Sequence, residues 1–147
     1  MQEPLDLRQS ASIRMDLKLK IADDVLIAEL SGQLTLREAL KVCMLACDGA
    51  AERGFSTFLL DASAVDGELS VLERYKLGKI VAEYCVSHGR FYKVALLGTE
   101  PAVTGFGALV ASNRGLLATQ FREGTKAQEW LNAFARGRSR PQPNQES

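Results

Sequence analysis

The sequence predicts a single-domain α/β fold with the element order β-β-α-β-α-β-α-β-α. Two segments, 58–60 and 94–97, are apolar at every position, which is typical of strands buried on both faces inside a parallel sheet. Segments with apolar residues at helical spacing follow each of them. Units of this length join parallel strands by right-handed crossovers. The length of 147 residues fits one domain with a core of its own.

Composition narrows the classes of function. The chain carries 18 basic and 18 acidic residues, so its overall charge gives no reason to expect a nucleic acid partner. We expect no integral membrane segment, because no apolar stretch approaches roughly 20 residues, and the first residues lack a secretory signal, which indicates a cytoplasmic location. Three cysteines make no disulfide framework, and we expect neither a metal nor a cofactor.

The first elements predict a hairpin at one side of the sheet. Residues 1–12 have no periodic pattern and indicate a flexible leader, so the domain is expected to span 13–135. Four apolar residues then alternate with charged ones, which predicts a half-exposed outer strand: Met15, Leu17, Leu19 and Ile21. A short turn leads into the segment 25–30, which is apolar except for Glu29.

The first helix is predicted from a capping box and an apolar stripe. Thr35 and Glu38 have the three-residue spacing in which each side chain binds the other residue's backbone amide. The stripe that follows recurs every three or four residues: Leu36, Leu40, Cys43, Cys47 and Ala50. Cys43 and Cys47 have a spacing that suits two metal ligands, but buried apolar side chains are the simpler interpretation.

The segment from Phe58 to Tyr84 contains the predicted central strand, the turn after it and the start of the next helix. Phe58 to Leu60 form the central strand, and three polar residues with Gly67 indicate a turn after it: Asp61, Ser63 and Asp66. Ser70 and Glu73 form a second capping box at the start of a helix. Its inward face is expected to comprise Leu72, Ile80, Val81 and Tyr84. Loops between a strand and a following helix commonly hold the functional site of an α/β fold.

The last third of the chain predicts three further elements and a tail. A helix over 104–113 has three residues at helical spacing for packing, Phe106, Leu109 and Val110, and Gly115 as its left-handed cap. A strand at 117–121 is followed by a helix with a third capping box, Thr125 with Gln128. Its packing residues are Trp130, Leu131 and Phe134. The polar, proline-containing residues 136–147 predict a disordered tail.

The order of elements, together with the segment 60–65 after the central strand, resembles the STAS domain of sulfate transporters and anti-sigma-factor antagonists. The later part is similar to the SpoIIAA-like bacterial subgroup, described as STAS/SEC14-related. It carries Phe106, Gly107, Ala111, the tripeptide 113–115 and Trp130 with Leu131. This resemblance covers about residues 13–134. It implies a mixed, mostly parallel five-stranded sheet with helices mainly on one face, and a regulatory module that is not an enzyme.

In STAS switches a kinase phosphorylates a serine at the start of the helix after the central strand. When Asp61, Ser63 and Val65 are placed on the family's matching positions, the family's Asp-Ser-Ser-Gly segment falls on residues 69–72. Val71 then occupies the phosphoacceptor position, and only Ser70 matches the pattern. A one-residue shift makes Ser70 the candidate phosphoacceptor, although its capping role already explains a serine there.

Two hypotheses for function follow. The first is a protein partner bound by the loop and the following helix through Asp61, Ser63, Asp66, Glu68 and Ser70. The second is an apolar, lipid-like ligand held between the second and third helices, which the SEC14 relationship suggests. Its expected lining is Leu69, Leu72, Tyr75, Val103, Phe106 and Val110. A helical layer on one face would leave the other uncovered, so we also expect a homodimer.

The remaining constellations have simpler structural explanations. Three carboxylates near the loop, Asp61, Asp66 and Glu68, suit acid–base chemistry or a weak magnesium site, but turn formation accounts for the first two. The single histidine, His88, precedes a glycine at a helix end and is expected to be a surface or capping residue. Gly98, Gly105 and Gly107 surround a helix start without the spacing of a phosphate-binding loop.

Overall fold

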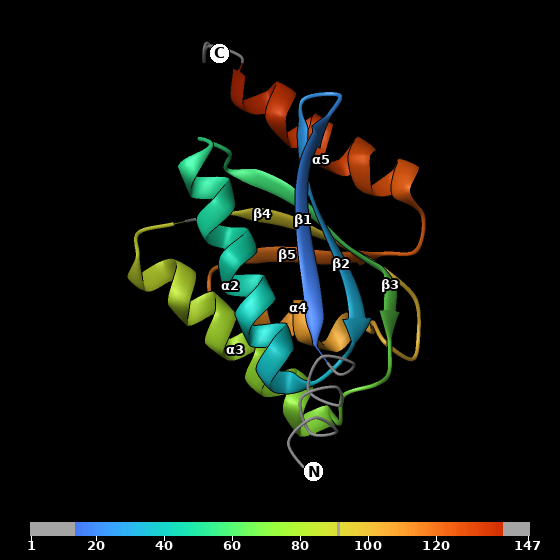
Figure 1. The fold of residues 1–147 in the computed structure, drawn as a ribbon. Helices are drawn as coiled ribbons and strands as arrows, with labels where there is room; N and C mark the ends of the chain where they lie inside the picture. The colour runs from blue at the N-terminus through green and yellow to red at the C-terminus, as the bar shows by residue number, and fades with distance from the viewer. Residues whose placement is uncertain (1–13, 91, 140–147) are drawn as a thin grey trace, which may run out of the picture.

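The computed structural model describes residues 14–90 and 92–139, with side chains up to residue 133, and has the predicted order of elements. Figure 1 shows their arrangement. The strands are β1 (Met15–Ala22), β2 (Val25–Gln33), β3 (Thr57–Asp66), β4 (Lys93–Leu97) and β5 (Leu117–Phe121). The helices are α2 (Leu36–Glu52), α3 (Val71–Ser87), α4 (Gly105–Ser112) and α5 (Gly124–Ser139). Helix α5 thus extends into the segment expected as a tail, whereas the expected leader, 1–12, lies outside the described residues.

The five strands form one mixed sheet in the order β1-β2-β3-β4-β5. Strands β1 and β2 are antiparallel, and all the other pairs are parallel. Strand β3 is the middle strand, with Leu59 beside Ile27 on β2 and Ala95 on β4. The predicted fold class is therefore confirmed, including the central position of the Phe58 segment.

The predicted hairpin is present at the β1 edge of the sheet. Asp23 and Asp24 join its strands with left-handed backbone angles, φ 53° and 64°. Aspartate tolerates this conformation better than most residues, which explains the choice of residue in the turn. The apolar side chains of β1 become more exposed toward the turn: Met15 is buried, whereas Ile21 is exposed. An edge strand with one packed face explains this alternation.

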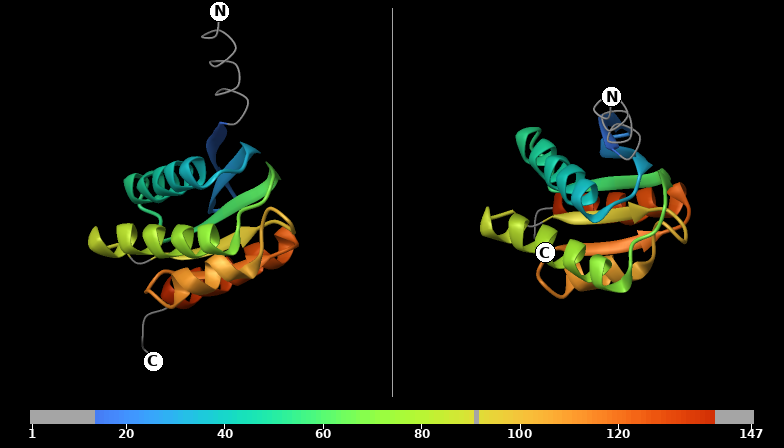
Figure 2. Two further views of the ribbon diagram at one scale, coloured as in Figure 1. Left: turned by 90° about the horizontal axis from the view of Figure 1, so that it is seen from below. Right: turned by 60° about the horizontal axis from the view of Figure 1, so that its bottom comes forward.

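Helices cover both faces of the sheet, but unequally. In Figures 1 and 2, α2 and α3 lie side by side over one face. The larger core lies beneath them and includes Phe58 and Leu60. Leu59 points to the other face and joins a smaller core with Ala127 and Leu131 of α5. Because α5 covers part of this second face, the physical reason for expecting a homodimer is weakened.

Two of the three predicted capping boxes are not formed. Thr35 caps α2 by accepting from the Glu38 amide at 3.2 Å, but Glu38 does not complete a capping box. Its carboxylate accepts instead from the Met15 amide, 3.0 Å away, and thereby joins α2 to β1. Helix α5 begins at Gly124, so Thr125 lies inside the helix and the predicted box with Gln128 is wrong.

The packing faces of the last two helices also differ from the prediction. Phe106 and Leu109 of α4 are exposed, whereas Val110 is buried as expected. In α5, Leu131 is buried and Trp130 partly buried, and the side chain of Phe134 lies outside the described residues. Gly115 adopts the predicted left-handed conformation, with φ 100°. None of the described helices has the length and apolar character needed to cross a membrane.

Helices α3 and α4 approach closely because both have a glycine at their crossing. A Cβ added at Gly78 would lie 2.4 Å from the carbonyl oxygen of Gly107, and 3.1 Å from Cβ of Val110. The small face of α4 therefore turns toward α3, and this explains why its larger residues, Phe106 and Leu109, point outward.

Replacing Gly78 by alanine should destabilise the domain, because the new methyl group collides with backbone that cannot move alone. We expect the free energy of unfolding to fall by about 1–3 kcal/mol in urea denaturation. Gly107→Ala is the control: its Cβ meets only the Arg74 carbonyl oxygen, at 3.6 Å, an ordinary contact. That variant should keep or slightly exceed the parent stability, since alanine favours helix. Equal effects of the two substitutions would contradict this description of the crossing.

Candidate functional site

The candidate site begins where β3 extends beyond its neighbour. Strand β4 pairs with β3 only as far as Asp61, while β2 follows β3 to Asp66. The predicted turn over Asp61, Ser63 and Asp66 is therefore wrong, because these residues continue the strand. A bulge interrupts the pairing, since Glu29 lies beside Asp61 but Ser31 lies beside Ala64. One extra residue in β3 accounts for the irregularity.

Asp61 and Ser63 are held together at this bulge. The Asp61 carboxylate accepts from the amide of Ser63 at 3.0 Å and from its hydroxyl at 2.6 Å. Both residues line a surface hollow of about 420 Å³ over β1, β2 and β3, together with Glu29. Asp16 also lines this hollow, and Glu29 is paired with Lys20 at 2.8 Å, so one of the three carboxylates there has a close cationic partner.

Asp66 and Glu68 lie farther along, where β3 gives way to α3. The carbonyl oxygen of Asp66 accepts from the Leu34 amide at 2.8 Å, and Gly67 turns the chain with φ 108°. Asp66 lines a different hollow, of about 180 Å³, with Ser63 and the loop before α4. Glu68 lines neither hollow, although it is exposed. The three carboxylates suggested for catalysis therefore do not share one hollow.

The capping box at the start of α3 is confirmed in both directions. The Ser70 hydroxyl accepts from the Glu73 amide at 3.1 Å, and the Glu73 carboxylate accepts from the Ser70 amide at 2.9 Å. These bonds satisfy two amides that the helix leaves without partners and place the first helical residue, Val71. Val71, which the family resemblance aligns with the phosphoacceptor, has no hydroxyl.

The first turn of α3 exposes two adjacent apolar side chains. Val71 is 71% exposed and Leu72 is 61% exposed, so the predicted inward position of Leu72 is wrong. The buried positions of α3 begin only at Gly78, where the helix reaches the sheet and α4. We call the exposed residues Asp66, Glu68, Ser70, Val71 and Leu72 the cap surface.

An apolar cavity of about 80 Å³ lies beneath α3 and α4, and only two of the six predicted ligand-lining residues, Leu69 and Val103, line it. The other four, Leu72, Tyr75, Phe106 and Val110, do not, because α3 and α4 touch directly at their glycines.

Arg74 is the charged residue in this lining, and its guanidinium links α3 to the start of α4. Its Nη1 donates to the Thr104 hydroxyl and its Nη2 to the Pro101 carbonyl oxygen, both at 2.9 Å. Its Nε is buried without a hydrogen-bond partner. Helices α3 and α4 therefore begin at the same end of the sheet.

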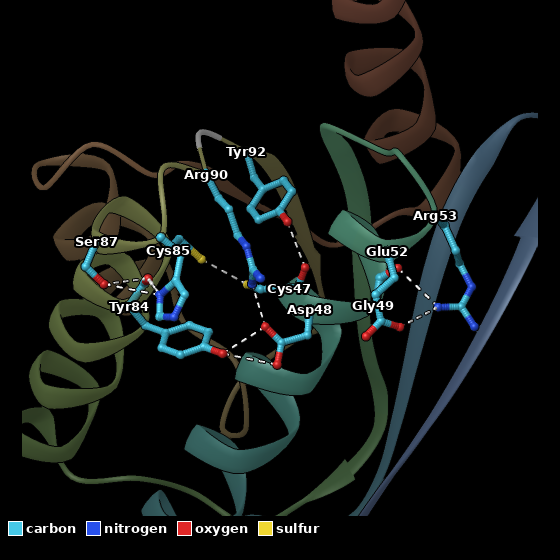
Figure 3. A network of polar contacts seen from close by, with 11 residues as sticks. Cys47, Asp48, Gly49, Glu52, Arg53, Tyr84, Cys85, Ser87, Arg90 and Tyr92 are labelled. Atoms are coloured by element: carbon cyan, nitrogen blue, oxygen red, sulfur yellow. Dashed lines mark hydrogen bonds and ion pairs between the residues drawn. The ribbon is translucent and has the colours of Figure 1, made fainter.

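A polar network at the opposite end of α3 was missed by the sequence reasoning (Figure 3). The Tyr84 hydroxyl donates to both carboxylate oxygens of Asp48, at 2.8 and 3.1 Å, and Arg90 also donates to this carboxylate. Burial alone would raise the pKa of Asp48, but these hydrogen bonds outweigh it and lower the pKa.

Two further residues complete this end of the molecule. His88 is the exposed C-cap of α3, which confirms its predicted capping role. Its ring also contacts Tyr84 in a tilted arrangement, with the ring centroids 4.4 Å apart. Tyr92 is buried, and its hydroxyl donates to the carbonyl oxygen of Cys47 at 2.7 Å. The residues come from two separated segments, 47–48 and 84–92, and no motif in either segment signals that the two segments meet.

Comparison with known proteins supports the fold. No family model and no curated protein sequence matches this chain. Among solved structures, it is similar to an anti-sigma factor antagonist from Mycobacterium paratuberculosis, with a TM-score of 0.54 and 14% identity over 80% of this chain and 94% of that one. It is also similar to an uncharacterised protein with a SpoIIAA-like fold from Shewanella loihica, with a TM-score of 0.48 and 22% identity over 80% and 93% of the two chains.

The likeness to the anti-sigma factor antagonist shows a shared fold. The order of elements and the mixed five-stranded sheet agree with it. The chain therefore shares the fold of this anti-sigma factor antagonist, which agrees with the fold that the sequence predicted.

Removing the Ser70 hydroxyl should weaken the start of α3. We expect Ser70→Ala to lower the free energy of unfolding by about 1 kcal/mol in chemical denaturation, because the Glu73 amide loses its acceptor. Ser70→Asp is the matched control, since an aspartate accepts from the same amide and should retain most of the stability. Parent-like stability of Ser70→Ala, or an equal loss in both variants, would contradict the capping role.

Proposed function

We propose that this chain is a non-enzymatic, STAS-like regulatory module that binds a protein partner through the cap surface. The observation that carries the proposal is the exposed apolar pair at the start of α3. Val71 and Leu72 are exposed directly after a complete capping box, and the exposed carboxylates of Asp66 and Glu68 precede them in the sequence. The fold of the anti-sigma factor antagonist supports the same class of function by analogy.

The cap surface has the composition of a binding site. Burying a valine or leucine side chain stabilises a complex by roughly 1.5–3 kcal/mol each, so this pair supplies the apolar centre of an interface. The carboxylates around it favour a partner that places lysine or arginine next to an apolar side chain. Asp61 and Ser63, at the bulge, extend the surface toward the middle of β3.

The arrangement of ionisable groups favours binding over catalysis. Asp61 and Asp66 line separate hollows, and Glu68 lines neither. His88 caps the far end of α3, and a helix of 17 residues separates it from Ser70 by roughly 25 Å. A general acid and base must both reach one reacting group, and these residues are not placed to do so.

Ser70 carries the hydroxyl group of the cap surface. If the module is regulated by phosphorylation, this is the group that a partner kinase would modify. A phosphate there would lie at a helix N-terminus, where the helix dipole favours negative charge. It would also face the Glu73 carboxylate, which binds the Ser70 amide. Phosphorylation would therefore break the capping box and change the cap surface directly.

Leu72→Glu should abolish partner capture without unfolding the domain. We expect proteins that the parent chain retains from a lysate of the source organism to be lost with this variant, in quantitative proteomics and then in calorimetry with the purified partner. Leu45→Glu is the control, because Leu45 is a leucine of α2 that is 48% exposed and lies outside the cap surface. The proposal fails if the two variants retain the same proteins.

A second candidate function is a carrier or sensor of a small apolar ligand, and the cavity beneath α3 and α4 favours it. Apolar residues and the unpartnered Nε of Arg74 line it. Its volume of about 80 Å³ lies far below the roughly 300–1,000 Å³ of typical ligand pockets. It suits a molecule of a few heavy atoms, and a lipid would require the helices to separate.

Native mass spectrometry of the purified protein tests this second candidate. We expect a bound species of low mass that disappears in Val103→Phe, because the larger ring fills the cavity. Leu109→Phe, an exposed change on the neighbouring helix, should leave it bound. Detection of no bound species in the parent protein, or equal binding by Val103→Phe, would rule against a carrier.

A further inference from the structure

Two cysteine thiols meet between α2 and α3. The Sγ atoms of Cys47 and Cys85 are 3.1 Å apart, and both residues are almost fully buried. A disulfide requires a separation of about 2.0 Å, so closing the pair needs a movement of roughly 1 Å. Side-chain rotation and a small helix adjustment supply such a movement. Cys43, the third cysteine, lies one turn earlier on α2.

The surroundings make the two thiols unequal. The hydrogen bond shared with Cys47 is the main cause that lowers the pKa of Cys85, and the positive charge of Arg90 adds to this effect, while burial and Asp48 oppose it. The same hydrogen bond and burial raise the pKa of Cys47. Two tyrosine hydroxyls form hydrogen bonds next to the thiols: that of Tyr84 with Asp48, and that of Tyr92 with the carbonyl oxygen of Cys47. Cys85 is therefore the thiol that ionises first and acts as the nucleophile.

We propose that Cys47 and Cys85 form an oxidative modification site, at which a hydroperoxide converts the thiol pair into a disulfide joining α2 to α3. The Cys85 thiolate attacks one peroxide oxygen, so an S–O bond forms, the O–O bond breaks, and the alkoxide or hydroxide leaves and takes up a proton. Cys47 then loses its proton and attacks the Cys85 sulfur, and hydroxide leaves as water. Two thiols are oxidised and one hydroperoxide is reduced.

The position of the pair provides access despite its burial. Cys85 lies in the last turn of α3, which ends at Ser87, and Cys47 lies near the end of α2, which ends at Glu52. Helix ends open locally more readily than helix centres. A hydroperoxide that enters during such opening reacts with Cys85, and reclosure brings Cys47 onto the oxidised sulfur. The thiol–thiol contact in the described part of the chain is that of Cys47 and Cys85, and burial raises the pKa of Cys43 to about 12.

Treatment of the purified full chain with hydrogen peroxide tests the site. After unfolding, alkylation and non-reducing trypsin digestion, we expect peptides 42–53 and 80–90 to be joined, with a loss of two hydrogens that dithiothreitol reverses. Peptide 42–53 contains both Cys43 and Cys47, so the Cys43→Ser variant identifies the partner of Cys85. This variant should form the same cross-link, whereas Cys47→Ser and Cys85→Ser should form none.

A second measurement separates a native disulfide from adventitious oxidation. Oxidation of the parent and of Cys43→Ser should raise the thermal unfolding midpoint by about 10 °C, because the link closes a long loop in the unfolded chain. A cross-link through Cys43, sulfinic or sulfonic acid on single cysteines, or unchanged free thiols would overturn the proposal. It does not depend on the proposed partner binding, which the Leu72 variant tests separately.

Discussion

Strand β3 is the constraint on which the rest of the structure depends, because both cores are built on it. Phe58 and Leu60 face the core under α2 and α3, and Leu59 faces the core under α5. A one-residue shift of the register would turn each of these side chains into the opposite core, where the neighbouring residues are packed around a different side chain. The far end of β3, and the start of α3 that follows, are therefore held in one place.

Helix α3 connects the two regions to which we assign a role. Its first turn carries the cap surface, where the Ser70–Glu73 bonds present Val71 and Leu72 to solvent. Its last turn carries Cys85, paired with Cys47 of α2. The glycine crossing with α4 lies between these ends. A covalent link at the C-terminal end would restrict the motion of the same helix whose N-terminal end is proposed to bind a partner.

Local chemistry was readable from the sequence, and tertiary choices were not. The apolar run at Phe58 and the capping box at Ser70 were confirmed. The same local signal failed at Glu38, because its carboxylate binds the distant Met15 amide instead. Leu72 and Phe106 were assigned to packing faces because helical spacing does not say which side meets the sheet. The close approach of α3 and α4 at Gly78 determines which side of α4 is buried. The Cys47–Cys85 contact joins residues 38 positions apart, and no motif marks it.

Hydrogen–deuterium exchange of the chain with and without its purified partner tests the central claim most directly. The footprint reports which backbone amides the partner covers, without any substitution in the chain. The account predicts new protection in residues 66–75, at the end of β3 and the first turn of α3. Protection confined to α5 or to the β1–β2 hairpin, with unchanged exchange in residues 66–75, would contradict it.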